Sequence, residues 1–320
     1  MEEELLNTLD TNLSFIVEIS TLNLIQIGLK YGVFKEMIGR KRYADFLLSS
    51  AVKNKSLLKS LVDTYHSLGI VEMGLNDAWV KEYSYTLELT SEKNRYLLPD
   101  WIPIFEEIYR MVDYASISPE HPKILMDFDK DSDFWDMRLG VQLNSIYRRL
   151  INQIGELKDG MKVLDLGCGS VSPVEIGEVV GPNGEYVGVD FSPGLLSIAE
   201  QKVRNLGFDW VTLKELDITR IKPRKIYDAV IMSFVLEYVQ DIPTVIRNAL
   251  NALHEGGKII IVDPFRENYP NIEAWEFFER LTKEFIHFPS KEEVIKAFDY
   301  NGYDVKIREF GKSILSIELL

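Results

Sequence analysis

One stretch of the chain, residues 162–170, constrains the fold more than any other. It reads Lys-Val-Leu-Asp-Leu-Gly-Cys-Gly-Ser, an apolar run that meets an acidic residue and breaks into a turn with two glycines. A short apolar run bounded by glycine is typical of a buried β-strand. Because glycine has no Cβ, the backbone of such a turn can approach a ligand closely. The stretch therefore predicts a strand that ends in a ligand-binding loop.

Strands and helices alternate from about residue 156 onward. The predicted strands cover residues 161–166, 185–190, 210–216, 227–233, 257–262, 302–309 and 313–319. This alternation predicts an α/β fold, with a largely parallel sheet of seven strands and helices on both faces. The last two strands are joined at Gly311-Lys312, and this connection is too short for a parallel crossover. The last strand is therefore predicted to run antiparallel.

The N-terminal part of the chain has a different, mostly helical pattern. Apolar residues at helical spacing predict helices over residues 4–38 and 56–69. Two strand-like runs, residues 70–73 and 78–87, are separated by Gly74-Leu75-Asn76-Asp77 and predict a hairpin. Helices followed by a hairpin predict a winged-helix-like domain.

The length of 320 residues favours more than one domain. We predict three segments. Residues 1–100 form the helical, winged-helix-like domain, residues 101–155 form linker helices, and residues 156–320 form the ligand-binding α/β domain.

Charge and composition bear on partners and location. The net charge of −14 disfavours nucleic acid as a partner, since such a surface repels phosphate backbones. Cys168 is the single cysteine, so no internal disulfide is possible. The acidic N-terminus is unlike a secretory signal, and no apolar run approaches the ~20 residues that cross a bilayer. We expect a cytoplasmic protein without a membrane partner.

Acidic residues gather between residues 127 and 136. Their spacing does not fit a calcium loop, because Ser132 stands where the loop's glycine belongs and Arg138 where its glutamate belongs. We interpret the segment as a solvated acidic turn. No histidine or carboxylate cluster has metal-site spacing, so no metal is predicted.

The predicted strand ends bring several candidate ligand-binding residues to one edge of the sheet, where open α/β sheets bind their ligands. These are Asp165, Gly167, Gly169, Asp190, Asp217 and Ser233. Asp190 is placed to accept hydrogen bonds from the two hydroxyls of a ribose. The dinucleotide fingerprint G-x-G-x-x-G would need a glycine where Ser172 stands. The negative charge of Asp165 suits a sulfonium or an α-amino group better than a pyrophosphate, which indicates S-adenosylmethionine.

Five segments in order, residues 163–169, 187–192, 216–218, 227–233 and 253–263, resemble the motifs of class I S-adenosylmethionine-dependent methyltransferases. The resemblance implies the Rossmann-like seven-stranded sheet of that family. It also implies that the glycine loop contacts the methionine part of the cofactor, that Asp190 and its neighbour Phe191 lie at the ribose, and that Asp217 and Ile218 lie at the adenine. Val171 departs from the pattern, since many members have a further glycine there.

The N-terminal half resembles the dimerisation domain of small-molecule O-methyltransferases, through residues 25–34 and 57–71. This resemblance implies a homodimer whose first helices form the interface. We therefore predict a methyltransferase acting on a small-molecule acceptor, with oxygen as the methylated atom.

The residues that would activate the acceptor depart from the plant-type O-methyltransferases. Glu237 stands where those enzymes have a histidine base, so either it is the base or it is a structural hydrogen-bond acceptor. His287 lies where the family has acceptor-contacting insertions. Glu237 keeps open a second interpretation, methylation of carbon or nitrogen on a quinone-like acceptor. A third is a non-catalytic transcriptional regulator that binds the cofactor.

Overall fold

The computed structural model describes residues 2–87, 91–120, 125–222 and 224–319. The chain forms two compact units. The first consists of Met1–Asn12, Asp127–Asn268 and Ile286–Leu320, and the second of Leu13–Met126 and Tyr269–Phe285. These units cross the predicted boundaries, because residues 127–155 belong with the α/β part and residues 269–285 belong with the N-terminal part.

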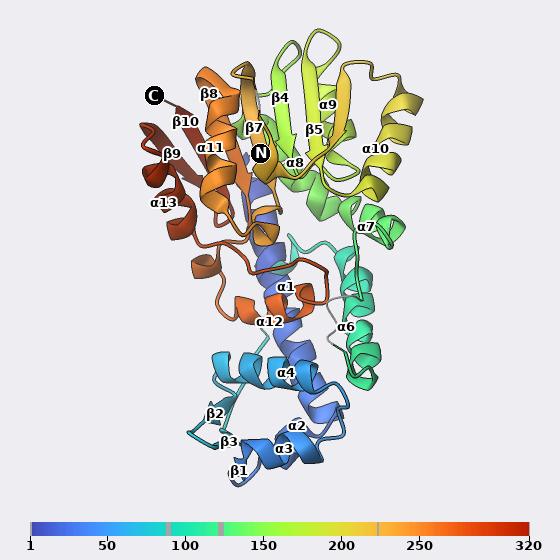
Figure 1. The fold of residues 1–320 in the computed structure, drawn as a ribbon, viewed down its shortest axis with the longest axis vertical. Helices are drawn as coiled ribbons and strands as arrows, with labels where there is room; N and C mark the ends of the chain where they lie inside the picture. The colour runs from blue at the N-terminus through green and yellow to red at the C-terminus, as the bar shows by residue number, and fades with distance from the viewer. Residues whose placement is uncertain (1, 88–90, 121–124, 223, 320) are drawn as a thin grey trace. The chain divides into compact units, whose positions relative to one another are not determined.

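The first unit is built on a seven-stranded sheet in the order β6-β5-β4-β7-β8-β10-β9 (Figure 1). Its strands are β4 (Lys162–Leu166), β5 (Glu185–Asp190), β6 (Val211–Glu215), β7 (Tyr227–Ser233), β8 (Leu253–Val262), β9 (Val305–Phe310) and β10 (Ile314–Leu319). Strands β4 to β8 are parallel, whereas β10 pairs antiparallel with both β8 and β9. This confirms the predicted α/β sheet and its antiparallel last strand.

Helices cover both faces of this sheet (Figure 1). They are α8 (Gln142–Ile154), α9 (Ser172–Val180), α10 (Pro193–Leu206), α11 (Ile242–Ala252) and α13 (Lys291–Asn301). Helices α11 and α13 pack against each other on one face, and α9 contacts both α8 and α10. The core between the sheet and α11 is apolar, with Ile246, Leu250 and Phe298 among its fully buried members.

Local sequence explains where the helices beside the ligand-binding edge begin and end. Helix α10 begins after Ser192, whose side chain accepts a hydrogen bond from the backbone of Leu195, and Pro193 occupies the first turn. It ends at Gly207, which adopts the left-handed conformation that glycine tolerates. These signals fix the start of α10 directly after β5.

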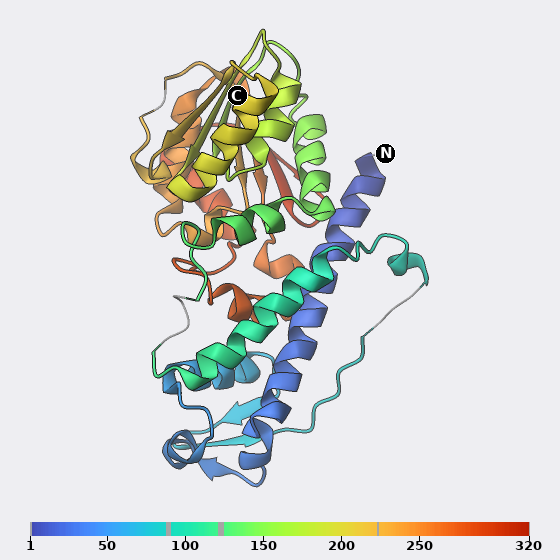
Figure 2. The same cartoon turned by 90° about the vertical axis from the view of Figure 1, so that its right-hand side faces the viewer.

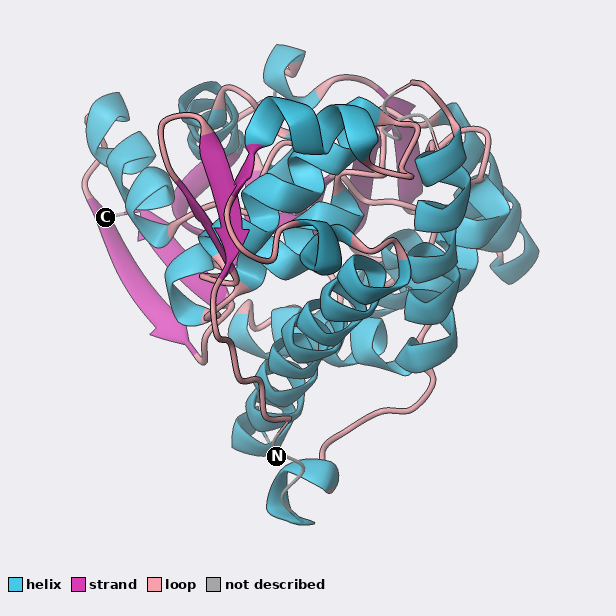
Figure 3. Cartoon of the chain, turned by 90° about the horizontal axis from the view of Figure 1, so that it is seen from below, coloured by secondary structure: helices cyan, strands magenta, loops and turns pink. Residues whose placement is uncertain are grey.

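The second unit is mostly helical, with one small sheet (Figures 2 and 3). Its elements are most of α1 (Glu2–Lys30), then α2 (Val33–Glu36), β1 (Lys41–Arg42), α3 (Tyr43–Ser49), α4 (Lys55–Ser67), β2 (Val71–Met73), β3 (Asp77–Val80), α5 (Ser91–Asn94), α6 (Trp101–Ile117) and α12 (Ile272–Glu279). The three short strands form an antiparallel sheet in the order β1-β3-β2. Helix α12 contacts α4, and the ring of Phe278 lies 5.5 Å from that of Phe105 on α6.

Several N-terminal predictions need correction. The predicted helix over residues 4–38 is broken at Gly32, which has φ 69°, so α1 and α2 are separate. The predicted strand over residues 78–87 ends at Val80. Strand β1 and helix α3 were not predicted, because elements of two and seven residues are too short to show a clear periodicity.

Helix α1 is long and apolar enough to cross a membrane by length and composition. This corrects the expectation that no segment of the chain could do so. Half of its most apolar window is nevertheless buried inside the protein, including Leu13, Ile16 and Leu24. The core helix of a soluble protein meets the same criterion.

Candidate active site

The loop after β4 lies at the centre of the candidate site. In the sheet order β4 stands between β5 and β7, so its carboxyl end is flanked by those of both neighbours. Gly167 and Gly169 have φ of 79° and 57°, values that L side chains rarely adopt. A Cβ at Gly167 would lie 2.5 Å from Cγ2 of Val235, so glycine is needed here for space as well as conformation.

Asp190 joins this loop to the end of β5. Its Oδ2 accepts a hydrogen bond from the backbone N–H of Gly169 at 2.8 Å, and its Oδ1 accepts one from the N–H of Ser192 at 2.9 Å. Burial raises the pKa of the Asp190 carboxyl, although hydrogen bonds from the neighbouring amides oppose the shift. The carboxylate is therefore held in one orientation at the place where a ribose was predicted.

Asp165 lies beneath the loop. It is fully buried, and its Oδ2 accepts a hydrogen bond from the Tyr186 hydroxyl at 2.6 Å. Its Oδ1 has no hydrogen-bond partner among the described residues. Burial raises the pKa of Asp165 to about 7. The hydrogen bond joins Asp165 to Tyr186 on β5, and the contact of Asp165 with a cationic ligand stays a prediction.

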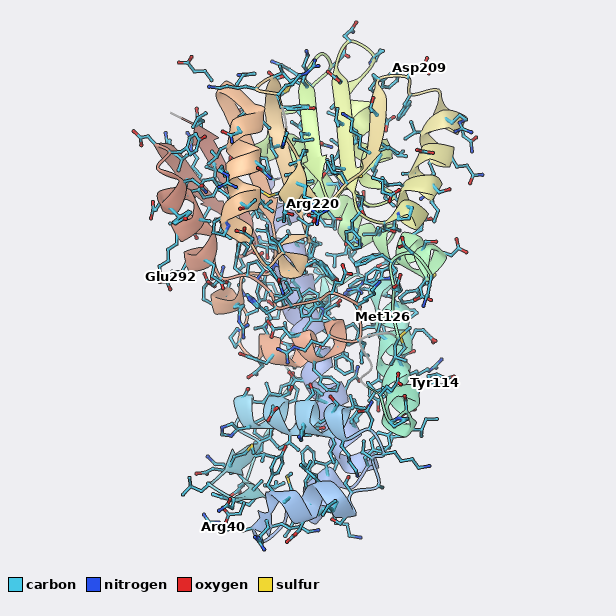
Figure 4. All side chains as sticks on the ribbon, in the orientation of Figure 1. Arg40, Tyr114, Met126, Asp209, Arg220 and Glu292 are labelled. Atoms are coloured by element: carbon cyan, nitrogen blue, oxygen red, sulfur yellow. The ribbon has the colours of Figure 1, made fainter. Side chains whose placement is uncertain are left out.

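The end of β6 supplies the predicted adenine-side residues. Asp217 caps the short 3-10 helix η2 (Ile218–Arg220), with its Oδ1 accepting hydrogen bonds from the N–H and hydroxyl of Thr219. These bonds lower the pKa of Asp217. Ile218 is nearly buried, and its carbonyl accepts a hydrogen bond from Asn248. Arg220 pairs with Asp217. Figure 4 labels Asp209, which precedes β6, and Arg220, which follows it, so the two labels lie beyond opposite ends of this strand.

The acidic segment 127–139 is more than the solvated turn that the sequence indicated, because its carboxylates bind the loops after β4 and β5. Oδ1 of Asp129 accepts hydrogen bonds from the Ser192 hydroxyl at 2.7 Å and from the N–H of Gly194 at 3.3 Å. Oδ1 of Asp136 accepts one from the Ser170 hydroxyl at 2.6 Å and also pairs with Lys202. The segment, which includes α7 (Ser132–Leu139), is thus bound to the loops after both β4 and β5 (Figure 1).

An aromatic cluster extends along the same edge of the sheet. The ring of Phe128 lies 4.4 Å from Trp135, 5.5 Å from Phe191 and 5.2 Å from Tyr238, measured between ring centroids. Phe191 follows β5 and Tyr238 follows β7, so the cluster spans the width of β4 and its glycine loop. We call Phe128, Trp135, Phe191 and Tyr238 the rim aromatics.

Two buried carboxyls follow β7 and β8. Glu237 lies in the 3-10 helix η3 (Leu236–Tyr238), and Asp263 follows the last residue of β8 directly. Ser233, the last residue of β7, is paired with Val262 in the parallel register. The two carboxyls therefore leave neighbouring strand ends. Asp263 was not predicted as a site residue. Its strand lies beside that of Glu237 in the folded sheet, and sequence spacing does not show which strands are neighbours.

His287 makes its contacts elsewhere. Its Nδ1 lies 2.9 Å from the carbonyl oxygen of Phe288, and its Nε2 lies 3.9 Å from Oε1 of Glu293, in the first turn of α13. These two contacts account for the orientation of the His287 ring. Its contact with an acceptor stays a prediction.

No metal site accompanies these residues in the described part of the chain, where no group of three or more His, Cys, Asp or Glu side chains is placed to hold an ion. Cys168 is buried within the glycine loop, where burial raises the pKa of its thiol well above the usual value. It is a small residue that fills the turn.

The edge fits an adenosine-type ligand. Asp190 presents an oriented carboxylate, the two left-handed glycines leave the loop backbone uncovered by Cβ atoms, and η2 borders the far side. S-adenosylmethionine would be held by Asp190 at its ribose and by the glycine loop at its methionine part. When bound, it supplies a methyl group on a sulfonium.

Comparison with known proteins agrees with this arrangement. Residues 157–302 match the family described as "Methyltransferase domain". The uncharacterized protein MJ0906 of Methanocaldococcus jannaschii is 31% identical over 314 residues, which cover 97% of this chain and 86% of that protein. The demethylmenaquinone methyltransferase of Anoxybacillus flavithermus is 26% identical over 218 residues, covering 60% of this chain and 92% of the relative.

Among solved structures, the CurJ carbon methyltransferase has the same fold across nearly the whole chain. It superposes with a TM-score of 0.63 at 15% identity, covering 98% of this chain and 91% of that one. The similarity to MJ0906, the matched domain and the site geometry lead to one conclusion: the chain belongs to the same family as MJ0906, and it is an enzyme with a class I S-adenosylmethionine-dependent methyltransferase domain.

Proposed function

We propose that the protein transfers the methyl group of S-adenosylmethionine to a ring carbon of a small, planar acceptor of the quinol class. The observation that carries this proposal is the pair of features beside the glycine loop, the rim aromatics and the Glu237 carboxyl. Support also comes from the relative that methylates demethylmenaquinone. The alternative that the sequence left open, methylation of a quinone-like acceptor, is thereby preferred over methylation of oxygen.

The rim aromatics suit a planar acceptor. Aromatic rings pack favourably on one another in offset or edge-to-face arrangements, and they bury large apolar areas. Phe191 is 42% exposed, so one of the four rings still presents a surface to a ligand, either the cofactor ribose that the resemblance places there or an acceptor. An acceptor stacked on this cluster would lie beside the glycine loop, where the methyl donor is expected.

The reaction depends more on aligning the acceptor carbon with the methyl donor than on activating that donor. The nucleophilic ring carbon forms a bond to the methyl carbon as the bond from sulfur to that carbon breaks, and S-adenosylhomocysteine is the product. A ring carbon next to a phenolate is nucleophilic, and it loses its proton to restore aromaticity. The protein contributes by holding the two reactants in line and by excluding water.

The N-terminal half supports a second part of the proposal, a homodimer. We propose that helices α2, α3 and α4 with the sheet β1-β3-β2 form a winged-helix-like domain, as in the dimerisation domain that the sequence resembles. A cytoplasmic homodimer formed through this half is the expected state. Light scattering coupled to size-exclusion chromatography tests it, and a monomer at micromolar concentration would refute it.

A labelled-methyl assay tests the reaction itself. Purified protein is incubated with methyl-labelled donor and with either a reduced demethylmenaquinone or a catechol, and the product is analysed by mass spectrometry and NMR. A methyl group on a ring carbon supports the proposal, and a methoxy product replaces it with O-methylation. Salt-sensitive binding to duplex DNA without transfer to any acceptor would favour the regulator interpretation.

A further inference from the structure

Arg148 on α8 is a charged side chain in the interior, with 1% of its surface exposed. Its Nε and Nη2 donate hydrogen bonds to Oε2 and Oε1 of Glu175 at 2.9 and 3.2 Å. Nη2 also donates to the carbonyl of Leu139 at 2.8 Å, and Nη1 donates to the Tyr147 hydroxyl at 3.0 Å. Removing a charge from water is costly, so a buried arginine needs partners of good geometry, and these bonds supply them.

The partners of Arg148 belong to the two helices that border the glycine loop. Glu175 lies in the first turn of α9, which begins at Ser172, directly after the loop. Leu139 is the last residue of α7, and the final carbonyls of a helix have no partner within it. The guanidinium therefore connects the C-terminal end of α7 to the N-terminal end of α9.

Helix α7 packs on the glycine loop at the same place. A Cβ at Gly169 would lie 3.0 Å from Cδ1 of Leu139, so the Leu139 side chain lies directly against this glycine. Earlier in the same helix, Asp136 accepts a hydrogen bond from the Ser170 hydroxyl at 2.6 Å. Arg148 thus holds the carbonyl of the residue whose side chain contacts the loop.

Tyr147 extends this support to the next strand. Its ring lies 5.1 Å from that of Phe234, which follows β7 and has a φ of 50°. A bulky residue keeps this left-handed conformation only where its surroundings hold it there. Val235 comes next, and its Cγ2 would lie 2.5 Å from a Cβ at Gly167. Tyr147 and Arg148 together therefore support the loop from the side of β7 as well as from α7 and α9.

We propose that Arg148 is a positioning residue for the methyl donor. It keeps α7 and α9 against the glycine loop, so that the loop backbone stays in the arrangement that receives the methionine part of S-adenosylmethionine. A site made of loop backbone binds tightly only when the elements beside it fix that backbone closely. By thermodynamic linkage, bound cofactor strengthens the hold on α7 in return. This goes beyond the proposed function, because it concerns the donor and does not depend on which acceptor is methylated.

The role requires an arginine. All three nitrogens of the guanidinium take part, and their N–H groups are fixed in one plane that reaches Glu175, Leu139 and Tyr147. A lysine keeps the charge but carries its donors on one nitrogen, so it cannot form the paired bond to Glu175 and also bond to Leu139. Arg148→Lys therefore breaks the connection without changing the charge.

Calorimetry with the donor alone tests the proposal. Arg148→Lys should weaken S-adenosylmethionine binding at least about tenfold, which corresponds to the loss of roughly one charge-assisted hydrogen bond. Arg149→Lys is the matched control, because Arg149 is the next residue on α8 and is exposed, so its affinity should change less than about twofold. An affinity of Arg148→Lys within that same range of wild type would overturn the proposal.

Hydrogen–deuterium exchange separates local positioning from a general loss of stability. Without cofactor, Arg148→Lys should exchange faster in α7 and in the first turn of α9, while β8 and β10 keep their wild-type rates. Added cofactor should slow exchange in both helices of the wild type, but much less in α7 of the variant. Faster exchange throughout the sheet, with protection of α7 by the cofactor retained, would show a purely structural role and overturn the proposal.

A second variant keeps the proposal testable if Arg148→Lys does not fold. Glu175→Gln removes the charge of a partner whose side chain is 32% exposed, and it preserves the shape of that side chain. It should weaken cofactor binding in the same direction, and wild-type affinity in this variant would overturn the proposal. Where both variants fold, the double variant should lose little more than Arg148→Lys alone, because both changes break the same connection. Fully additive losses would contradict the proposal.

Discussion

Oδ2 of Asp190 accepts a hydrogen bond from the backbone N–H of Gly169 at 2.8 Å, and this bond connects the ends of β4 and β5. The same carboxylate that is expected to hold the ribose therefore also holds the loop that is expected to hold the methionine part. Loss of Asp190 should damage both halves of the cofactor site at once.

We predict that Asp190→Ala weakens S-adenosylmethionine binding at least about a hundredfold, because hydrogen bonds to a charged group contribute ~1.5–3 kcal/mol each. Asp217 is the matched comparison, since it lies on the same edge but is half-exposed and caps only η2. Asp217→Ala should weaken binding about tenfold or less. Isothermal titration calorimetry measures both, and equal affinities for Asp190→Ala and wild type would contradict the ribose assignment.

A substitution at Gly167 tests whether the glycine loop has room for a Cβ atom. Gly167→Ala places a Cβ 2.5 Å from Val235 at a φ of 79°, so we expect a loss of ~1–3 kcal/mol in the free energy of unfolding together with weakened cofactor binding. Gly160→Ala is the control, because Gly160 has a φ of 94° but no atom within 4 Å of the added Cβ. Urea denaturation compares the two. The double variant Gly167→Ala with Val235→Ala should recover part of the loss, and no recovery would show that the contact is irrelevant.

Asp165 gives a prediction for pH. Its folded pKa of about 7 lies above the ordinary 3.8, so the folded state binds the proton more tightly than the unfolded state in that window. The free energy of unfolding should therefore fall as pH rises from about 4 to about 7, by up to ~1.4 kcal/mol per pH unit from this group. Asp190 and Asp263, whose pKa values are also raised, act in the same direction.

Asp165→Asn removes one titrating group and should reduce this slope, as measured by urea denaturation between about pH 5 and pH 8. Asp217→Asn is the control. Because the pKa of Asp217 is lowered, its contribution to stability is lost only as pH falls below its ordinary range, and the slope above pH 5 should not change. An Asp165→Asn slope equal to that of wild type would contradict the prediction.

The attachment of the acidic segment 127–139 to the neighbouring loops can be tested at Asp129. Asp129→Ala removes its bonds to Ser192 and Gly194, so we expect faster amide exchange in this segment and cofactor binding about three- to tenfold weaker. Asp133→Ala on the same segment is exposed and is the matched control. Hydrogen–deuterium exchange detected by mass spectrometry reads the effect. Unchanged exchange in Asp129→Ala would show that the segment is held by other contacts.

Strands that end at the ligand could be predicted because they carry their own signals. Residues 185–190 and 227–233 are apolar runs with acidic or polar ends, and the structure has β5 and β7 over those residues. The predicted strand over residues 257–262 begins four residues later than β8, which starts at Leu253. His254-Glu255-Gly256 has the composition of a turn, but pairing with β7 extends the strand through it. Local sequence does not contain the pairing that lengthens a strand.

Contacts between segments that are distant in the sequence explain the remaining differences between the predicted site and the observed one. Asp129 bonds to Ser192, and Asp263 and Glu237 follow neighbouring strands, only because the fold brings separate strand ends and a preceding loop together. In the sequence, Asp129 belongs to an acidic run typical of a solvated turn, and Asp263 is a lone acidic residue before Pro264. Each becomes a candidate only when the neighbouring strand ends are known.

The position of α12 has a consequence for the order in which the protein can fold during synthesis. This helix follows β8 in the chain, yet it packs on α4 and α6 in the unit that begins with residue 13. The N-terminal unit therefore cannot complete its core until residue 285 has left the ribosome. A nascent chain that stops at residue 268 would carry an exposed apolar surface where Phe278 belongs, and exposed apolar surface makes an incomplete chain prone to aggregate.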